Sequence, residues 1–205
     1  MKKINCFNFF VCIILMLGTV RSQVEIKDYY KEICFKTEWG GAIKPAKYKK
    51  PVKIYVAGVK SQELNHELYQ IVMELNILIE SIDVSITNDR LESNMLVYFG
   101  TPENYMHYID DYSDAERLEE NWGLFSFYRT GFDRSEIKFS EVFVNTIDTR
   151  NKVQQKHLLR EELTQALGFP NDSYKYEDSI FQQRWTEVTE YSILDKEIIR
   201  LHYNR

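Results

Sequence analysis

The sequence has little cysteine. Three cysteines occur in 205 residues, and two of them, Cys6 and Cys12, lie in an N-terminal segment that we expect to be removed. Cys34 would then be the only thiol of the mature chain, so no intramolecular disulfide can form. A lone thiol is more often a small buried hydrophobe than a nucleophile. We therefore predict a fold that needs neither disulfides nor cysteine chemistry.

Long apolar runs are also scarce. The one extended run, Phe9 to Val20, follows two lysines and is shorter than the roughly 20 residues that a membrane-spanning helix needs. Val20 and Ser22 then place small or modest side chains at the third-last and last positions, which suits signal peptidase. We predict a signal peptide over residues 1–22, export to the periplasm or the extracellular space, and no membrane span after cleavage.

The chain lacks an excess of basic residues. Its 26 Lys and Arg against 31 Asp and Glu give a net charge of -5. Removing Lys2, Lys3 and Arg21 leaves 23 basic residues and a net charge of -8. This balance argues against a nucleic-acid partner and against binding to anionic lipid by charge. No repeat, low-complexity tract or linker interrupts residues 23–205, so we predict a single domain there.

Hydrophobic periodicity predicts an alternation of strands and helices. Residues 23–50 are interpreted as a solvated lead-in, and the acidic residues 110–120 as a short solvated helix. The other expected elements, in order, are a strand over 51–58, a long amphipathic helix over 61–82, strands over 83–87, 94–99 and 136–146, a helix over 148–167, and a last helix opened by a Ser192 and Asp195 capping box.

Residues 158–167 predict a helix with one packing face and one polar face. At about 100° per residue, Leu159, Leu163 and Leu167 fall on one stripe. Glu161 and Gln165 project together from another side. One face is therefore expected to pack and the other to present oxygen atoms.

This helix is expected to stop sharply. Gly168 fits a left-handed helix end, and Pro170 prevents the helix from resuming. The chain must turn there and return Asn171 toward the helix. This layout resembles the zinc-binding helix of the metzincin clan of metallopeptidases, above all its matrixin-like branch.

The metzincin helix reads H-E-x-x-H-x-x-G-x-x-H, with three histidine ligands and a glutamate as general base. Aligned on Gly168, the resemblance places Glu161, Gln165 and Asn171 at the ligand positions and Glu162 at the base. The base and the glycine match, and all three imidazoles are replaced.

Two later segments carry the same resemblance. Residues 178–181, Asp-Ser-Ile-Phe, are similar to the Asp-Ser-Ile-Met segment of the methionine turn beneath the metal, with Phe181 in place of methionine. Residues 192–203 resemble the closing helix of matrixins. The whole pattern is similar to a bacterial family known as domain of unknown function 2927.

The resemblance implies an α+β, zincin-like fold: a mixed β-sheet with a long backing helix, the motif helix and a C-terminal helix. It gives Gly168, Asp178, Ser179 and Phe181 structural roles. It also implies that the strand before the motif helix, residues 136–146, lies at the sheet edge and binds peptide by strand addition. Lys138 and Glu136 could instead protect that edge.

The sequence leaves two alternatives for a cofactor, a divalent ion or no metal. Glu161, Gln165 and Asn171 offer one carboxylate and two amide oxygens, which are poor zinc ligands and suit another divalent ion better. In the alternative without metal, Asn171 and its neighbours Asp172, Ser173 and Ser179 tie the bend to the helix through hydrogen bonds. Glu162 is expected to be partly buried and to need a partner or a proton. His157 is interpreted as an exposed histidine that binds no metal.

Three functions remain. The first is an exported zincin-like domain without zinc-dependent proteolysis, acting as a binding or envelope-associated module for a peptide or protein. The alternative is a metal-dependent peptidase or hydrolase with an oxygen-ligand site and Glu162 as general base. The third is a partner-binding protein that uses the aromatic residues between 98 and 132.

Overall fold

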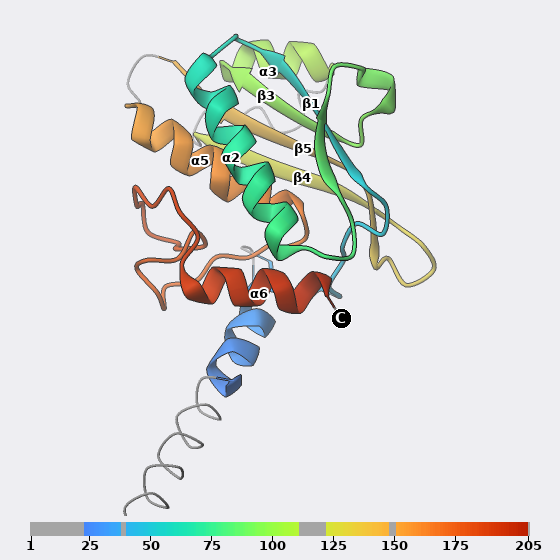
Figure 1. The fold of residues 1–205 in the computed structure, drawn as a ribbon, viewed down its shortest axis with the longest axis vertical. Helices are drawn as coiled ribbons and strands as arrows, with labels where there is room; N and C mark the ends of the chain where they lie inside the picture. Colours follow the sequence, from blue (N-terminus) through green and yellow to red (C-terminus); the bar gives the residue numbers. More distant parts are fainter. Residues whose placement is uncertain (1–22, 38–39, 111–121, 148–150, 205) are drawn as a thin grey trace, which may run out of the picture.

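The fold is built on a five-stranded mixed sheet with the strand order β2-β1-β3-β5-β4 (Figure 1). The computed structural model describes residues 23–37, 40–110, 122–147 and 151–204, so the predicted signal peptide and nearly all of the acidic segment lie outside the described residues. The strands are β1 Val52–Gly58, β2 Val84–Thr87, β3 Met95–Gly100, β4 Gly123–Thr130 and β5 Glu136–Asn145. The first three and β5 run parallel, and β4 pairs antiparallel with β5.

Helices flank the sheet. They comprise a helix over residues 23–34, α2 Gln62–Leu78, α3 Pro102–Ile109, α5 Lys152–Ala166 and α6 Ile193–Tyr203, with a short 3₁₀ turn, η1, at Arg90–Glu92. Side-chain caps open the main helices: Ser61 caps α2, Asn151 caps α5, and Ser192 with Asp195 forms the predicted capping box of α6. The predicted α+β fold, with a backing helix, a motif helix and a C-terminal helix, is confirmed.

The alternation of side chains along each strand divides the apolar residues between two cores. In β3, Val97 belongs to the main core with α2, α5 and α6, while Tyr98 faces a smaller core formed with α3. Tyr105 of α3 stacks on Phe143 of β5 in that smaller core, with ring centroids 4.9 Å apart. Several aromatic residues of the 98–132 region therefore cover the sheet.

The interpretation of residues 23–50 as a solvated lead-in is wrong. Residues 23–34 form a helix that lies beside α6 (Figure 1), and its Tyr29, Ile33 and Cys34 are buried in the main core. Because its buried face is narrow and is flanked by charges, its hydrophobic periodicity is too weak to indicate a helix from the sequence. Cys34 is buried as predicted, and burial raises the pKa of its thiol.

The strand that was expected at the sheet edge, residues 136–146, is instead the second strand from that edge. β5 lies inside the sheet between β3 and β4, and among the described residues β4 forms this edge while β2 forms the opposite one. The sequence patterns predict no element over residues 123–130. The two strands form a hairpin whose turn contains Gly131, in the left-handed region at φ 86°. The backbone groups that face outward along this edge therefore belong to β4.

Candidate functional site around the motif helix

The motif helix α5 crosses the main core and contacts β5, β4 and α2. Its first turn is fixed by a capping box, in which Asn151 accepts from the main chain of Gln154 and the Gln154 side chain accepts in return. Because three other elements surround it, ten of its fifteen residues are buried, and several of them are polar or charged. Each of those polar groups needs a partner.

His157 is almost fully buried, so its interpretation as an exposed histidine is wrong. Its Nδ1 lies 2.7 Å from the main-chain oxygen of Val188, to which it donates, and its Nε2 lies 3.3 Å from Glu161 Oε2. Burial lowers the pKa of His157, but the hydrogen bond and charge of Glu161 and the contact with Val188 outweigh it and raise that pKa. The segment after the bend covers this histidine, which sequence spacing alone does not reveal.

Arg160 lies at the centre of a charged cluster next to the site. Its guanidinium donates to Glu67 at 2.9 Å and Glu74 at 2.8 Å, both on α2, and lies 4.7 Å from the centre of the Tyr191 ring. Two carboxylates and an aromatic face thus surround a side chain that is only 2% exposed. This cluster joins the motif helix to the backing helix.

Glu162, the residue at the general-base position, is 8% exposed. Its carboxylate lies against Gly123, the first residue of β4, where an added Cβ would approach Oε1 to 2.4 Å. A residue with a side chain at position 123 would therefore displace the carboxylate. The burial of Glu162 agrees with expectation, and its carboxylate faces the beginning of the edge strand.

The bend after α5 depends on Gly168. This residue has a φ of 116°, and an added Cβ would lie 2.0 Å from the main-chain oxygen of Ala46 and 2.9 Å from His202 Nε2. The main-chain oxygen of Gln165 accepts hydrogen bonds from the amides of Gly168 and Phe169. A glycine is needed here for both its backbone conformation and its lack of a side chain.

The residues at the ligand positions each have a partner within the protein. Glu161 pairs with His157 as described. Gln165 Nε2 donates to Asp172 Oδ1 at 2.7 Å, and Asn171 Nδ2 donates to the main-chain oxygens of Glu32, at 3.1 Å, and Asp172, at 2.7 Å. The bend is thus tied to the motif helix and to the N-terminal helix.

This set of residues does not fit zinc. Catalytic zinc takes three nitrogen, sulfur or carboxylate ligands, whereas Glu161 alone of the three positions supplies one. Within the described parts of the chain, no three His, Cys, Asp or Glu residues are grouped as they would be to hold a metal ion. Sequence reasoning did not count Asp172 as a ligand, although its carboxylate lies next to Gln165.

The segment that resembles the methionine turn is held by a buried hydrogen-bond network. Ser179 Oγ donates to Asp195 Oδ1 at 2.6 Å and lies 2.6 Å from the hydroxyl of Tyr29. Asp195 Oδ2 accepts from the amides of Ile180 and Ser192. Burial raises the pKa of Asp195, and these hydrogen bonds counteract it only in part. Asp178 is exposed and stands outside this network.

Phe181 is completely buried and stacks on Phe169, with ring centroids 5.5 Å apart. The side chain at the methionine position therefore packs beneath the bend that carries Gly168. The turn and the bend form one apolar unit.

Two tryptophans form an exposed aromatic pair beside the site. Trp122, which precedes β4, and Trp185 are 36% and 46% exposed, and their rings meet edge to face at 4.8 Å. Trp185 also meets His157 edge to face, with centroids 5.6 Å apart. Trp185 had not been singled out from the sequence, where no regular spacing links it to the motif helix.

The sequence profile of DUF2927, a protein family of unknown function, matches residues 23–205. The chain belongs to the DUF2927 family.

Among solved structures, the DUF2927 domain is similar to two structures of myroilysin, a metzincin. One has a TM-score of 0.46 and 10% identity, covering 78% of this chain and 96% of that chain. The other has a TM-score of 0.47 and 9% identity, covering 86% and 93%. No curated protein sequence matches the domain.

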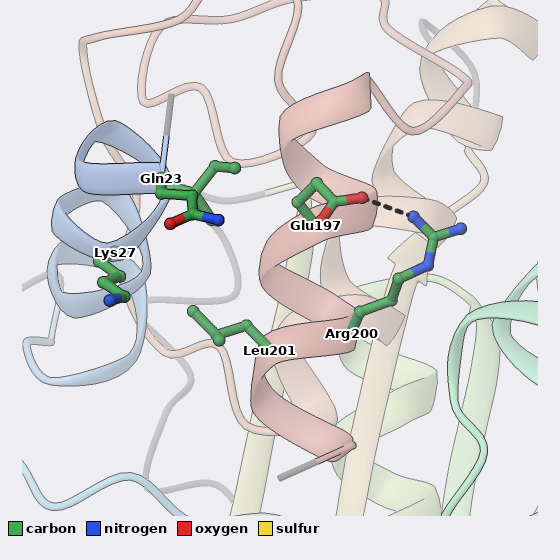
Figure 2. Close-up of a pocket in the computed structure, with 6 residues that line it drawn as sticks. Gln23, Lys27, Glu197, Arg200 and Leu201 are labelled. Atoms are coloured by element: carbon green, nitrogen blue, oxygen red, sulfur yellow. Dashed lines mark hydrogen bonds and ion pairs between the residues drawn. The ribbon is translucent and has the colours of Figure 1, made fainter. Parts of the chain in front are cut away.

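Two cavities lined by described residues lie away from the motif positions. One, of about 360 Å³, opens between the N-terminal helix, which contributes Gln23 and Lys27, and α6, which contributes Leu201 and the paired Glu197 and Arg200 (Figure 2). A larger one lies at the opposite end of the sheet. In the stretches that the structure describes, no helix is both long and apolar enough to cross a membrane.

Proposed function

We propose that this DUF2927 domain is an exported, zincin-like peptide-binding module that does not cleave its ligand by zinc-dependent hydrolysis. The observation that carries the proposal is what the side chains at the three ligand positions contact. Glu161, Gln165 and Asn171 each make a hydrogen bond or ion pair with another part of the chain. Binding zinc there would require breaking buried interactions to gain one carboxylate and two weak amide ligands.

The position and composition of β4 support peptide binding. Edge strands of natural sheets are usually protected by charges, prolines or bulges. From Gly123 to Tyr128, β4 has no charged residue and no proline, and its register shift comes only between Tyr128 and Arg129. The charges of Glu136 and Lys138 lie on the interior strand β5. The first six residues of β4 therefore suit the addition of an extended peptide.

The aromatic pair extends this surface at the beginning of β4. Trp122 and Trp185 combine large apolar area with little conformational entropy to lose on binding, which is typical of residues that anchor peptides. Glu162 lies against the same end of the strand. A peptide added along β4 would thus pass the pair and reach the motif helix.

The test is selection from a random peptide library, followed by amide hydrogen exchange with a selected peptide. Peptide addition should slow exchange across residues 124–128 and should be weakened about tenfold by Tyr128→Lys, which adds an edge charge. Tyr174→Lys is the matched control, because Tyr128 and Tyr174 are 68% and 65% exposed. Protection elsewhere, equal effects of the two variants, or pairing of β4 with a second copy of the chain would contradict the proposal.

Asp172 supports a second candidate, a hydrolase with an oxygen-ligand site for a divalent ion. Its carboxylate adds to that of Glu161 and to the Gln165 amide oxygen, and such oxygens suit calcium or magnesium. This candidate predicts one equivalent of metal in the purified protein, lost in Glu161→Ala/Gln165→Ala, and hydrolysis abolished by Glu162→Gln at unchanged Tm. The peptide-binding proposal predicts no bound metal in either protein and a Tm that chelators do not change.

A further inference from the structure

A second candidate binding site lies at the end of the sheet where β1 and β2 finish, on the side away from β4. A cavity of about 690 Å³ opens there between the carboxyl ends of these strands and the beginning of α2. Small-molecule sites have volumes of roughly 300–1,000 Å³. The cavity has the size of a ligand site and shares no lining residue with the motif helix.

The topology of the sheet explains why a crevice forms there. α2, which follows β1, packs on one face through Leu64 and Leu68, whereas α3, which follows β3, packs on the other through Tyr105. Where the helices after adjacent parallel strands leave to opposite faces, the carboxyl ends of those strands are uncovered, and α/β proteins bind ligands at such points. In Figure 1, β1, α2 and α3 meet at this upper end of the molecule.

The turn after β1 shapes the mouth of the cavity. Gly58 has a φ of 86°, and an added Cβ would lie 2.0 Å from the main-chain oxygen of Phe99. That oxygen also accepts a hydrogen bond from the amide of Val59 at 2.7 Å. The chain therefore passes close to the main chain of β3 at Gly58 and continues directly into α2. As a result, the first residues of α2 line the cavity.

The lining combines aromatic rings with carboxamides. Three tyrosines and three carboxamide side chains contribute, namely Tyr55, Tyr69, Tyr108, Gln62, Asn65 and Asn88. Lys60 is the one charged residue of the lining, and no carboxylate takes part, although the protein as a whole has a net charge of -5. The cavity therefore differs locally from the acidic character of the chain.

These polar groups are available to a ligand. Across the described residues, the side chains of Gln62, Asn65 and Asn88 have no protein hydrogen-bond partner, in contrast to Gln165 and Asn171 at the bend. Carboxamides both donate and accept hydrogen bonds, as sugar hydroxyls do. Aromatic rings bury the apolar face of a sugar ring.

We propose that this cavity binds a saccharide. The tyrosine rings contact the C–H face of a sugar, the carboxamides bond its hydroxyls, and Lys60 favours a sugar that carries a carboxylate. The site is independent of the peptide surface at β4, because it lies near the opposite edge of the sheet, at β1 and β2.

The experiment is an amide NMR titration of the purified protein with trimers of glucose, mannose, N-acetylglucosamine and galacturonate. We expect shifts in the residues around Asn65, the tightest binding for the galacturonate trimer, and an affinity loss of about tenfold in Tyr69→Ala. Met73→Ala is the control, since Met73 is 59% exposed one turn further along α2 and outside the lining. Lys60→Gln should remove the preference for galacturonate over the neutral trimers.

Three results would overturn the proposal: no shift at the cavity with any trimer, equal affinity for the Tyr69→Ala and Met73→Ala proteins, or binding of ATP at the cavity with no saccharide bound. Tyr69 is 58% exposed, so its replacement leaves the core intact, and an unchanged Tm verifies this.

Discussion

The motif helix and the cavity at the end of β1 are both rich in amides, but the two regions use them in opposite ways. Around the bend, Gln165 and Asn171 are buried and donate to protein oxygens. Around the cavity, Gln62 and Asn65 face open space at the first turns of α2. The bend is a structural unit held together by internal hydrogen bonds, whereas the cavity offers its polar groups to a ligand. Burial and hydrogen-bond partners, rather than residue type, separate the two.

The largest effect should come from the bend that closes the motif region. Gly168→Ala should destabilise the domain by about 5 kcal/mol, because it adds backbone strain to a clash with the main chain of Ala46. Gly40→Ala is the control: its φ is 79°, but no atom lies within 4 Å of the added Cβ, so about 1 kcal/mol is expected. Urea unfolding measures both. Equal losses would mean that crowding at the bend is not what requires the glycine.

Arg160→Ala should cost about 4 kcal/mol, because it leaves the largely buried carboxylate of Glu67 without its cationic partner. Replacing both partners, as in Arg160→Met with Glu67→Gln, should recover most of that loss. Urea unfolding of the two variants tests this expectation. A double variant as unstable as the single one would show that packing of the Arg160 side chain, rather than charge pairing, dominates.

The pH dependence of stability should show the burial of His202 beneath the bend. Burial lowers its pKa from 6.5 to about 4, and the nearby Lys47 adds to this, against a hydrogen bond to Ala46. Between these values the unfolded chain binds the proton more readily, so stability falls as pH drops from 6.5 to 4. The loss should approach about 3 kcal/mol.

His202→Gln should remove that part of the pH dependence, whereas His66→Gln, at an exposed position of α2, should leave it unchanged. Urea unfolding at about pH 7 and about pH 4.5 compares the three proteins. Parallel curves for wild type and His202→Gln would assign the dependence to other groups.

The smallest effects compare one amide from each region. Gln165→Ala should cost about 2 kcal/mol, because Asp172 loses a donor at a buried site. Asn65→Ala should change stability by less than about 0.5 kcal/mol, because its side chain is exposed. Thermal unfolding distinguishes these outcomes. A large loss in Asn65→Ala would show that the cavity residues are structural too, and would break the comparison.

Much of the fold could be predicted because it depends on spacing along the chain. The apolar periods gave β1, α2, β3 and β5 to within a few residues, and Ser192 with Asp195 marked the beginning of α6. β4 was missed, because residues 123–130 are apolar and aromatic with no clear alternation. The match to the metzincin motif at Gly168 also singled out the residues around the bend, although it could not show what each of them contacts.

The sequence by itself determined the order of the main elements other than β4 and the N-terminal helix, and it determined the polar face of the motif helix, because these follow from contacts two to four residues apart. Only the tertiary structure decided that β4 is an edge strand, that His157 and Arg160 are buried, and that Tyr55, Tyr69 and Tyr108 share a cavity. These outcomes depend on which distant segments pack together, and packing is set by the whole core rather than by any local pattern.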